Sequence, residues 1–160
     1  MERTIVAITG GASGIGLASA RAAVARGWHV AVSDRDTRAL AAAETELGAH
    51  ALYDTVDVTD EAAVEAWINR AAGYGRLIGL VTSAGIGADV PALDTGVDLF
   101  RKVHEVNVLG TFIAARAAAR VMADDGGSIV AIASVSGLRG SKGRVAYGSS
   151  KAAVINMAQA

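Results

Sequence analysis

The sequence predicts an α/β fold in which helices cover both faces of a doubly wound parallel sheet. Short β-branched apolar segments alternate along the chain with longer alanine-rich segments of helical period, which is the pattern of repeated strand and helix units. The strand segments are apolar at nearly every position, as expected when both faces of a parallel sheet are buried. Right-handed crossovers then place helices on both faces of the sheet.

Five strands and five helices follow from this alternation in chain order. We expect strands over residues 4–9, 29–34, 51–57, 77–83 and 128–134. We expect helices over residues 14–26, 36–47, 60–72 and 98–123, and from 146 to the end. Short polar side chains accept hydrogen bonds from the first N–H groups of a helix, and the predicted N-caps are Asp36, Asp60 and Asp98. Glycine readily adopts the left-handed conformation that ends a helix, and the predicted C-cap positions are Gly27, Gly48 and Gly73.

Composition favours a globular protein that binds small molecules. A chain of 160 residues can bury a sizeable core, and we expect residues 1–160 to form a single domain. A net charge of -1 offers no basic field for nucleic acid or an anionic membrane, and no apolar stretch has the length of a membrane span. Because the chain has no cysteine, it has no disulfide and no thiolate metal site. We expect a cytoplasmic protein without a metal centre.

A glycine-rich turn directly follows the first predicted strand and opens the first helix. It reads Thr9-Gly10-Gly11-Ala12-Ser13-Gly14-Ile15-Gly16. Glycines let the backbone approach a pyrophosphate closely, and the helix N-terminus supplies partial positive charge. An ordinary turn between strand and helix is the alternative interpretation. The candidate cofactor contacts in this turn are Gly10, Ser13, Gly14, Ile15 and Gly16.

The end of the second predicted strand indicates which dinucleotide is bound. Asp34 lies 18 residues after Gly16, close to the spacing at which a carboxylate meets the hydroxyls of the adenosine ribose. That carboxylate would repel a 2′-phosphate, whereas Arg35 beside it could pair with one. Because Ser13 leaves the turn without a basic residue, we predict NAD in preference to NADP.

Motifs further along the chain resemble those of the short-chain dehydrogenase/reductase family. The spacing of the glycine-rich turn is similar to the family's fingerprint. Tyr147 and Lys151 resemble its Tyr-x-x-x-Lys motif, and Ser134 precedes Tyr147 by 13 residues, as the family's catalytic serine does. Asn107 resembles the family's helix asparagine. The resemblance covers essentially the whole chain, and we predict a Rossmann sheet with the strand order 3-2-1-4-5.

The resemblance also implies cofactor contacts beyond the glycine-rich turn. Asp57-Val58 is similar to the pair that contacts adenine at the end of the third strand. Thr82-Ser83-Ala84-Gly85 stands where the family usually has Asn-Asn-Ala-Gly; the two hydroxyls can still hydrogen-bond the backbone there, but we expect the contacts that brace the sheet to be weaker. The candidate cofactor-binding residues outside the turn are Asp34, Arg35, Asp57, Val58, Ser83, Ala84, Gly85, Tyr147 and Lys151.

The candidate catalytic residues are suited to proton transfer beside a hydride transfer. Oxidising an alcohol requires a base, and reducing a ketone requires an acid. Tyr147 can serve as both, because an ammonium four residues later on the same helix face favours its phenolate. By resemblance, Lys151 also holds the nicotinamide ribose, Ser134 hydrogen-bonds the substrate oxygen, and Asn107 anchors a water that links Lys151 to solvent. We therefore predict hydride transfer between NAD(H) and a secondary alcohol or ketone, such as a polyol, a sugar alcohol, or a hydroxy or oxo compound.

Several features leave alternatives open. The sequence stops inside the helix that carries Tyr147, and we expect the resembled family's C-terminal strands to be missing from it. The alternative to an active enzyme is a truncated dinucleotide-binding module without turnover. A hydrolase is disfavoured, because no serine lies in a Gly-x-Ser-x-Gly elbow.

A basic cluster precedes Tyr147 in the sequence and comprises Arg139, Lys142 and Arg144. We interpret it as a solvated loop, and contact with an anionic substrate is the alternative.

The predicted helix over residues 98–123 carries apolar residues around much of its circumference. A helix that is apolar on several faces needs partners on several faces, and in the resembled family this helix packs against copies of itself. We therefore expect a homodimer or homotetramer in the complete protein. The residues concerned are Leu99, Phe100, Val103, Val106, Leu109, Phe112 and Ile113.

Overall fold

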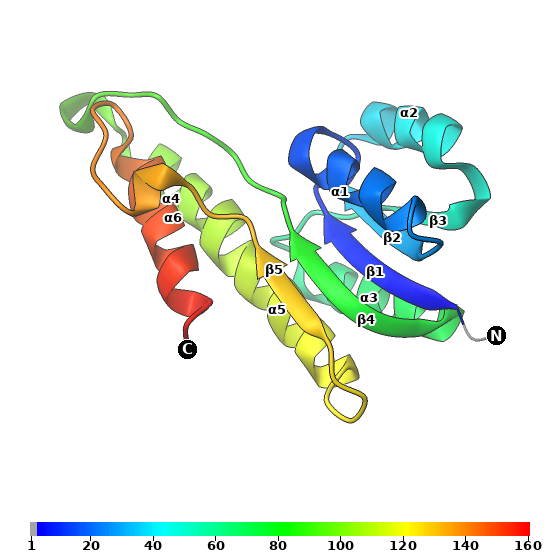
Figure 1. Ribbon diagram of the computed structural model, residues 1–160. Helices are drawn as coiled ribbons and strands as arrows, with labels where there is room; N and C mark the ends of the chain where they lie inside the picture. The colour runs from blue at the N-terminus through cyan, green and yellow to red at the C-terminus, as the bar shows by residue number, and fades with distance from the viewer. Residues whose placement is uncertain (1–2) are drawn as a thin grey trace.

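The computed structural model describes residues 3–160 as a five-stranded sheet with helices on both faces (Figure 1). The spatial order is β3-β2-β1-β4-β5 and every neighbouring pair is parallel, which confirms the predicted fold class and strand order. The strands are β1 (Thr4–Thr9), β2 (His29–Asp34), β3 (Ala51–Thr55), β4 (Arg76–Thr82) and β5 (Ser128–Ala131).

Six α-helices connect or follow these strands. They are α1 (Gly14–Val24), α2 (Thr37–Leu47), α3 (Glu61–Tyr74), α4 (Val97–His104), α5 (Gly110–Val121) and α6 (Val145–Met157). In Figure 1, α6 lies with α4 beyond the β5 edge, away from α1 and α2. Within residues 3–160, no helix is both long enough and apolar enough to cross a bilayer.

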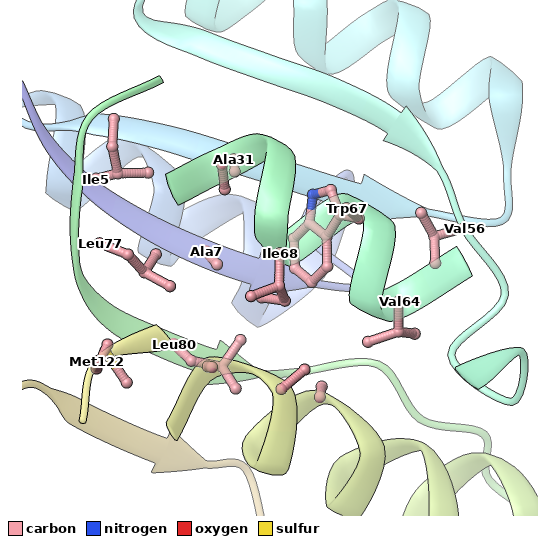
Figure 2. Close-up of a cluster of buried hydrophobic side chains, with 14 of the residues drawn as sticks. Ile5, Ala7, Ala31, Val56, Val64, Trp67, Ile68, Leu77, Leu80 and Met122 are labelled. Atoms are coloured by element: carbon pink, nitrogen blue, oxygen red, sulfur yellow. The ribbon is translucent and has the colours of Figure 1, made fainter. Parts of the chain in front are cut away.

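Two apolar cores result from the alternation of side chains along the central strands. Val6 and Ile8 of β1 face α1 and α2, whereas Ile5 and Ala7 face α3 and α5, because successive strand residues point to opposite faces. Figure 2 shows the second core, where Trp67 of α3 lies over the sheet. The near-continuous apolar strands of the sequence are therefore explained by burial on both faces.

Helix caps agree with the sequence at most of the predicted positions. Asp36 accepts hydrogen bonds from the backbone N–H groups of Arg38 and Ala39, at 2.9 and 3.1 Å. Asp60 likewise caps α3 by accepting from Ala63 at 3.1 Å. The predicted left-handed glycines are confirmed at two positions, with positive φ at Gly27 and Gly48.

Two predicted caps are wrong. Gly73 lies within α3, which continues to Tyr74. Asp98 lies within α4, which begins one residue earlier after Gly96. In both cases the helix extends past the local capping signal.

Several predicted element boundaries also differ from the structure, three of them near the candidate site. The strand β3 ends at Thr55, because Asp57 turns the chain by accepting hydrogen bonds from the N–H and hydroxyl of Thr59. The strand β5 ends at Ala131, so Ser134 lies in the following loop. The predicted helix over 98–123 is divided into α4 and α5 by the π-helical turn η3 (Glu105–Leu109).

Candidate functional site

A cleft of about 520 Å³ follows the edge of the sheet where the carboxyl ends of the strands meet. In a doubly wound sheet this edge opens where the chain leaves neighbouring strands in opposite directions, and ligands bind there. The cleft is lined by every predicted cofactor-binding residue except Gly16: Gly10, Ser13, Gly14, Ile15, Asp34, Arg35, Asp57, Val58, Ser83, Ala84, Gly85, Tyr147 and Lys151.

The glycine-rich turn is packed so tightly that side chains are excluded from it. Gly10 has a φ of 59°, and a Cβ there would lie 2.7 Å from the Cα of Ala84. A Cβ on Gly16 would overlap the carbonyl group of Gly10. Gly16 therefore lets α1 pack against the turn, which explains why it supports the cleft without lining it.

The first turn of α1 leaves its backbone N–H groups without a side-chain cap. Ser13 occupies the N-cap position but makes no capping hydrogen bond within residues 3–160, and the first turn of α1 carries no acidic side chain. Free N–H groups and the positive end of the helix dipole form a site suited to a phosphate group. The residues present thus fit a pyrophosphate at this turn.

Asp34 is held in place across the glycine-rich turn. One carboxylate oxygen accepts from the N–H of Asp36 at 3.1 Å, and the other accepts from the N–H of Ala12 at 3.4 Å. The carboxylate therefore has a fixed position on the cleft wall. Arg35 beside it lines the same cleft and is exposed.

Asp57 and Val58 follow β3 at the same end of the cleft. Hydrogen bonds from the backbone and hydroxyl of Thr59 lower the pKa of Asp57. Val58 is buried against the start of α5, where a Cβ on Gly110 would lie 2.6 Å from its Cγ2.

The loop after β4 is braced from a neighbouring strand. The hydroxyl of Thr82 is buried and has no hydrogen-bond partner among residues 3–160, which agrees with the weaker bracing expected of this segment. Instead, the backbone of Thr9 accepts from the N–H of Ser83, and its side chain accepts from the N–H of Ala84, both at 3.2 Å. The bracing contact comes from β1.

Asn107 connects the β4 loop to α6 from inside the π-helical turn. Its Oδ1 accepts from the N–H of Ile86 at 2.8 Å, while Nδ2 donates to the carbonyl of Ile86 at 3.0 Å and to Ser150 Oγ at 2.9 Å. The residue is fully buried. It lies behind the cleft wall, since a Cβ on Gly85 would lie 3.2 Å from its Oδ1.

Tyr147 and Lys151 bring ionisable groups to the far end of the cleft, one turn apart on α6. Lys151 Nζ donates to the carbonyl of Ile132 at 2.7 Å and lies 5.9 Å from the centroid of the Tyr147 ring. Lys151 is only 5% exposed, and this burial lowers its pKa. A cation and a phenol therefore share a partly desolvated pocket.

Ser134 is close to this pair along the chain but does not line the cleft. Its Oγ caps the short turn η4 (Val135–Gly137) by accepting from the N–H of Ser136 at 3.2 Å. The preceding Ile132 and Ala133 line the cleft. This turn packs on α6 so closely that a Cβ on Gly137 would lie 2.6 Å from the carbonyl carbon of Lys151.

Some cleft residues were not predicted from the sequence as parts of the site. Those after Gly85 could have been found from their place at the carboxyl end of a strand, whereas Arg144 was noted only as part of a basic loop. The additional lining residues are Val56, Ile86, Gly87, Ala88, Asp89, Val106, Ile132, Ala133 and Arg144.

Comparisons with known proteins agree with this geometry. The sequence profile described as short chain dehydrogenase matches residues 4–160. The chain is 42% identical to 2-dehydro-3-deoxy-L-rhamnonate dehydrogenase (NAD(+)) of Sphingomonas sp. (strain SKA58), with 92% of this chain and 60% of that protein covered.

Two solved structures are also similar. NAD+-bound xylitol dehydrogenase superposes with a TM-score of 0.91 at 34% identity, covering 96% of this chain and 62% of that one. ElxO with NADP bound gives a TM-score of 0.88 at 32% identity, covering 98% and 65%. The chain thus spans less than two thirds of the length of each of these three proteins.

Proposed function

The chain belongs to the short-chain dehydrogenase family, and on that premise we propose that it transfers hydride between NAD(H) and a secondary alcohol or ketone. One observation carries this proposal. The phenol of Tyr147 and the ammonium of Lys151 lie in the same cleft as the glycine-rich turn and Asp34. Residues 1–160 act as one dinucleotide-binding domain, and the substrate is a small molecule such as a polyol, a sugar alcohol or a hydroxy or oxo compound.

The two ends of the cleft are suited to the two halves of a dinucleotide. Asp34, Asp57 and Val58 hold the adenosine half, and the N-terminus of α1 holds the pyrophosphate. Gly85, Tyr147 and Lys151 surround the nicotinamide half. When bound, the nicotinamide supplies or accepts the hydride.

Asp34 favours NAD over NADP in this arrangement. Its carboxylate is anchored by two backbone N–H groups, so it cannot easily swing away from a 2′-phosphate. The same oxygens are positioned to accept hydrogen bonds from the ribose hydroxyls. Arg35 is exposed and would have to overcome this repulsion to favour NADP.

Tyr147 is the proton donor and acceptor for the substrate oxygen. The buried ammonium of Lys151 places a positive charge beside the phenol of Tyr147, and the carbonyl of Ile132 holds that ammonium in place. Ser134 directly follows the cleft-lining Ala133, and its hydroxyl hydrogen-bonds the substrate oxygen once it turns from the N–H of Ser136 toward the cleft. Asn107 anchors a water that links Lys151 to solvent. Asn107 also positions this end of the cleft by linking Ile86 to Ser150.

Self-association of the complete protein is part of the proposal. Phe100, Leu109 and Phe112 are 36%, 45% and 43% exposed on α4, the π-helical turn and α5. Val103 and Ile113 are buried inside the subunit, so the apolar circumference of this helix is only partly covered. A second copy would cover the exposed part and form a homodimer or homotetramer in the cytoplasm.

The deciding experiment uses the complete natural protein and separates turnover from cofactor binding. NAD(H) binding is measured by fluorescence titration, and hydride transfer is measured by NADH absorbance with a panel of secondary alcohols and ketones. Tyr147→Phe should lower turnover by at least about 100-fold and leave NADH affinity nearly unchanged. Binding without any turnover would indicate the alternative of a dinucleotide-binding module, and near-normal turnover in Tyr147→Phe would refute the assignment of the proton donor.

A further inference from the structure

The end of the cleft beside α6 carries a cation that the proposed hydride transfer does not use. Arg144 occupies the N-cap position of α6, and its side chain lines the cleft together with Tyr147. The guanidinium carbon lies 5.8 Å from the centroid of the Tyr147 ring. A group bound by Arg144 would therefore lie beside the phenol that exchanges a proton with the substrate.

The backbone around Arg144 is fixed, while its side chain remains accessible. The N–H of Val90 donates to the carbonyl of Gly143 at 2.7 Å, and the carbonyl of Arg144 accepts from Gly148 at the same distance. The first bond attaches the start of α6 to the loop that follows β4, and the second closes the first turn of α6. The Arg144 side chain is nevertheless 43% exposed, so a ligand can reach the guanidinium.

Asp89 shows how a carboxylate fits against this guanidinium. Arg144 Nε lies 2.7 Å from one Asp89 oxygen, and a terminal nitrogen lies 3.4 Å from the other. Two parallel contacts of this kind are the arrangement by which arginine recognises carboxylates. The Asp89 side chain is 72% exposed, and an ion pair this accessible contributes little stability, so a substrate carboxylate can replace it at low cost.

The distribution of charge favours an anion at this end of the cleft. A neighbouring groove of about 570 Å³ shares Arg144 and is also lined by Arg139 and Lys142. The other carboxylates of the cleft are Asp34, the last residue of β2, and Asp57, which follows β3. Together with Arg35 they leave a net negative charge toward the β3 edge of the sheet, opposite β5. A negatively charged substrate is thus attracted toward Tyr147 and away from the end assigned to adenosine.

We propose that Arg144 binds a carboxylate of the substrate, so that the protein acts on hydroxy acids and oxo acids in preference to neutral alcohols and ketones. This inference rests on the proposed function, because it assigns a substrate class to the same site. The substrate carboxylate takes the place of Asp89 on the guanidinium, and this contact directs the hydroxyl or carbonyl carbon toward Tyr147. Arg144, the one member of the basic cluster that lines the cleft, then acts as a specificity element.

The test compares matched substrates in the complete natural protein. NADH-dependent reduction is measured for 3-oxo, 4-oxo and 5-oxo acids and for their methyl esters, which keep the ketone and remove the charge. We expect kcat/KM for the acid to exceed that for its ester by at least about tenfold at one or more chain lengths. A hydrogen bond between charged groups is strong enough to give a difference of this size. Arg144→Gln should remove this preference, and Arg144→Lys should keep part of it.

Two further variants distinguish substrate binding from simple bracing of the loop. Asp89→Asn removes the competing carboxylate and should raise the preference for acids, whereas Arg144→Gln lowers it. Arg139→Gln removes an equal charge from the neighbouring groove, outside the cleft, and should leave the preference intact. Equal losses toward acids and esters in both Asp89→Asn and Arg144→Gln would mean that the ion pair only braces the loop.

Other outcomes separate this inference from the proposed function. Equal or better reduction of the esters by the wild-type protein would overturn the role of Arg144 and leave the hydride transfer intact. A protein that binds no NADH, or that reduces neither the acids nor the esters nor the wider panel of ketones, would instead overturn the proposed function itself.

Discussion

Replacing Asn107 with alanine should destabilise the fold strongly, because this side chain connects three parts of the site. The substitution removes the three hydrogen bonds that Asn107 makes to the backbone of Ile86 and to Ser150. Ile86 is half-buried, so leaving its N–H and C=O without a partner costs about 1 kcal/mol for each group. Loss of the Ser150 contact and of packing at a fully buried position adds about 1–2 kcal/mol.

The expected decrease in the free energy of unfolding is therefore about 3–4 kcal/mol, a large share of the 5–15 kcal/mol typical of a folded domain. Urea denaturation followed by circular dichroism measures it, and the midpoint should fall by about 1 M or more. Asn69→Ala is the matched control, because Asn69 is exposed on α3 and its removal should change stability by at most about 0.5 kcal/mol.

A double-mutant cycle tests whether the hydrogen bond to Ser150 is part of this effect. Ser150→Ala alone should cost about 1 kcal/mol or more, and the two substitutions together should cost less than the sum of the separate effects, because residues in contact couple. A loss below about 1 kcal/mol in Asn107→Ala would contradict this account. It would mean that water or a shifted loop provides hydrogen-bond partners for the backbone N–H and C=O of Ile86 in the absence of the asparagine.

Three further predictions concern charge, cofactor choice and assembly. Asp34→Ala should weaken NAD binding and improve the relative use of NADP, because a ribose hydrogen bond and a repulsive charge disappear together; an unchanged ratio of the two dissociation constants would contradict it. Burial lowers the pKa of Lys151 from its ordinary value of 10.5, so between the lowered pKa and 10.5 the unfolded chain binds more protons and stability rises with pH. The free energy of unfolding of the wild type relative to Lys151→Met should therefore increase as the pH approaches 10.5, and parallel pH profiles would refute the burial effect. Phe112→Glu should shift the complete protein toward monomer in sedimentation, since a two-fold contact brings both introduced charges together, whereas Leu93→Glu, at a fully exposed position in the short 3-10 turn Ala92–Asp94, should not; a wild-type monomer at micromolar concentration would remove the assembly proposal.

Much of the candidate site could be predicted because its signals are local in the sequence. The glycine-rich turn and Asp34 follow strands recognisable from apolar runs, and parallel strands place their carboxyl ends at one edge. Tyr147 and Lys151 lie four residues apart, so any helix brings them to one face. These residues do line one cleft in the structure.

The residues that brace the site could not be predicted in the same way. The sequence allowed the hydroxyl of Thr82 to contact the backbone of the β4 loop, but Thr9 from a neighbouring strand takes that role. The sequence of β4 alone does not indicate which neighbouring strand contributes a side chain to the loop that follows it. Asn107 was identified by resemblance as a water anchor, whereas its hydrogen bonds to Ile86 and Ser150 join segments 21 and 43 residues away.

The sequence by itself determined the fold class, because hydrophobic period, helix caps and turn glycines act over a few residues. The strand order and most of the residues gathered at the edge of the sheet followed from the resemblance of its motifs to a known family. Only the tertiary structure decided where the elements end and which distant side chains meet. The π-helical turn forms where Asn107 is buried against the β4 loop and where Gly110 packs on Val58. Arg144 meets Asp89 across 55 residues of chain. Such contacts depend on how the helices pack on the sheet. No local sequence pattern specifies which distant residue will be the partner.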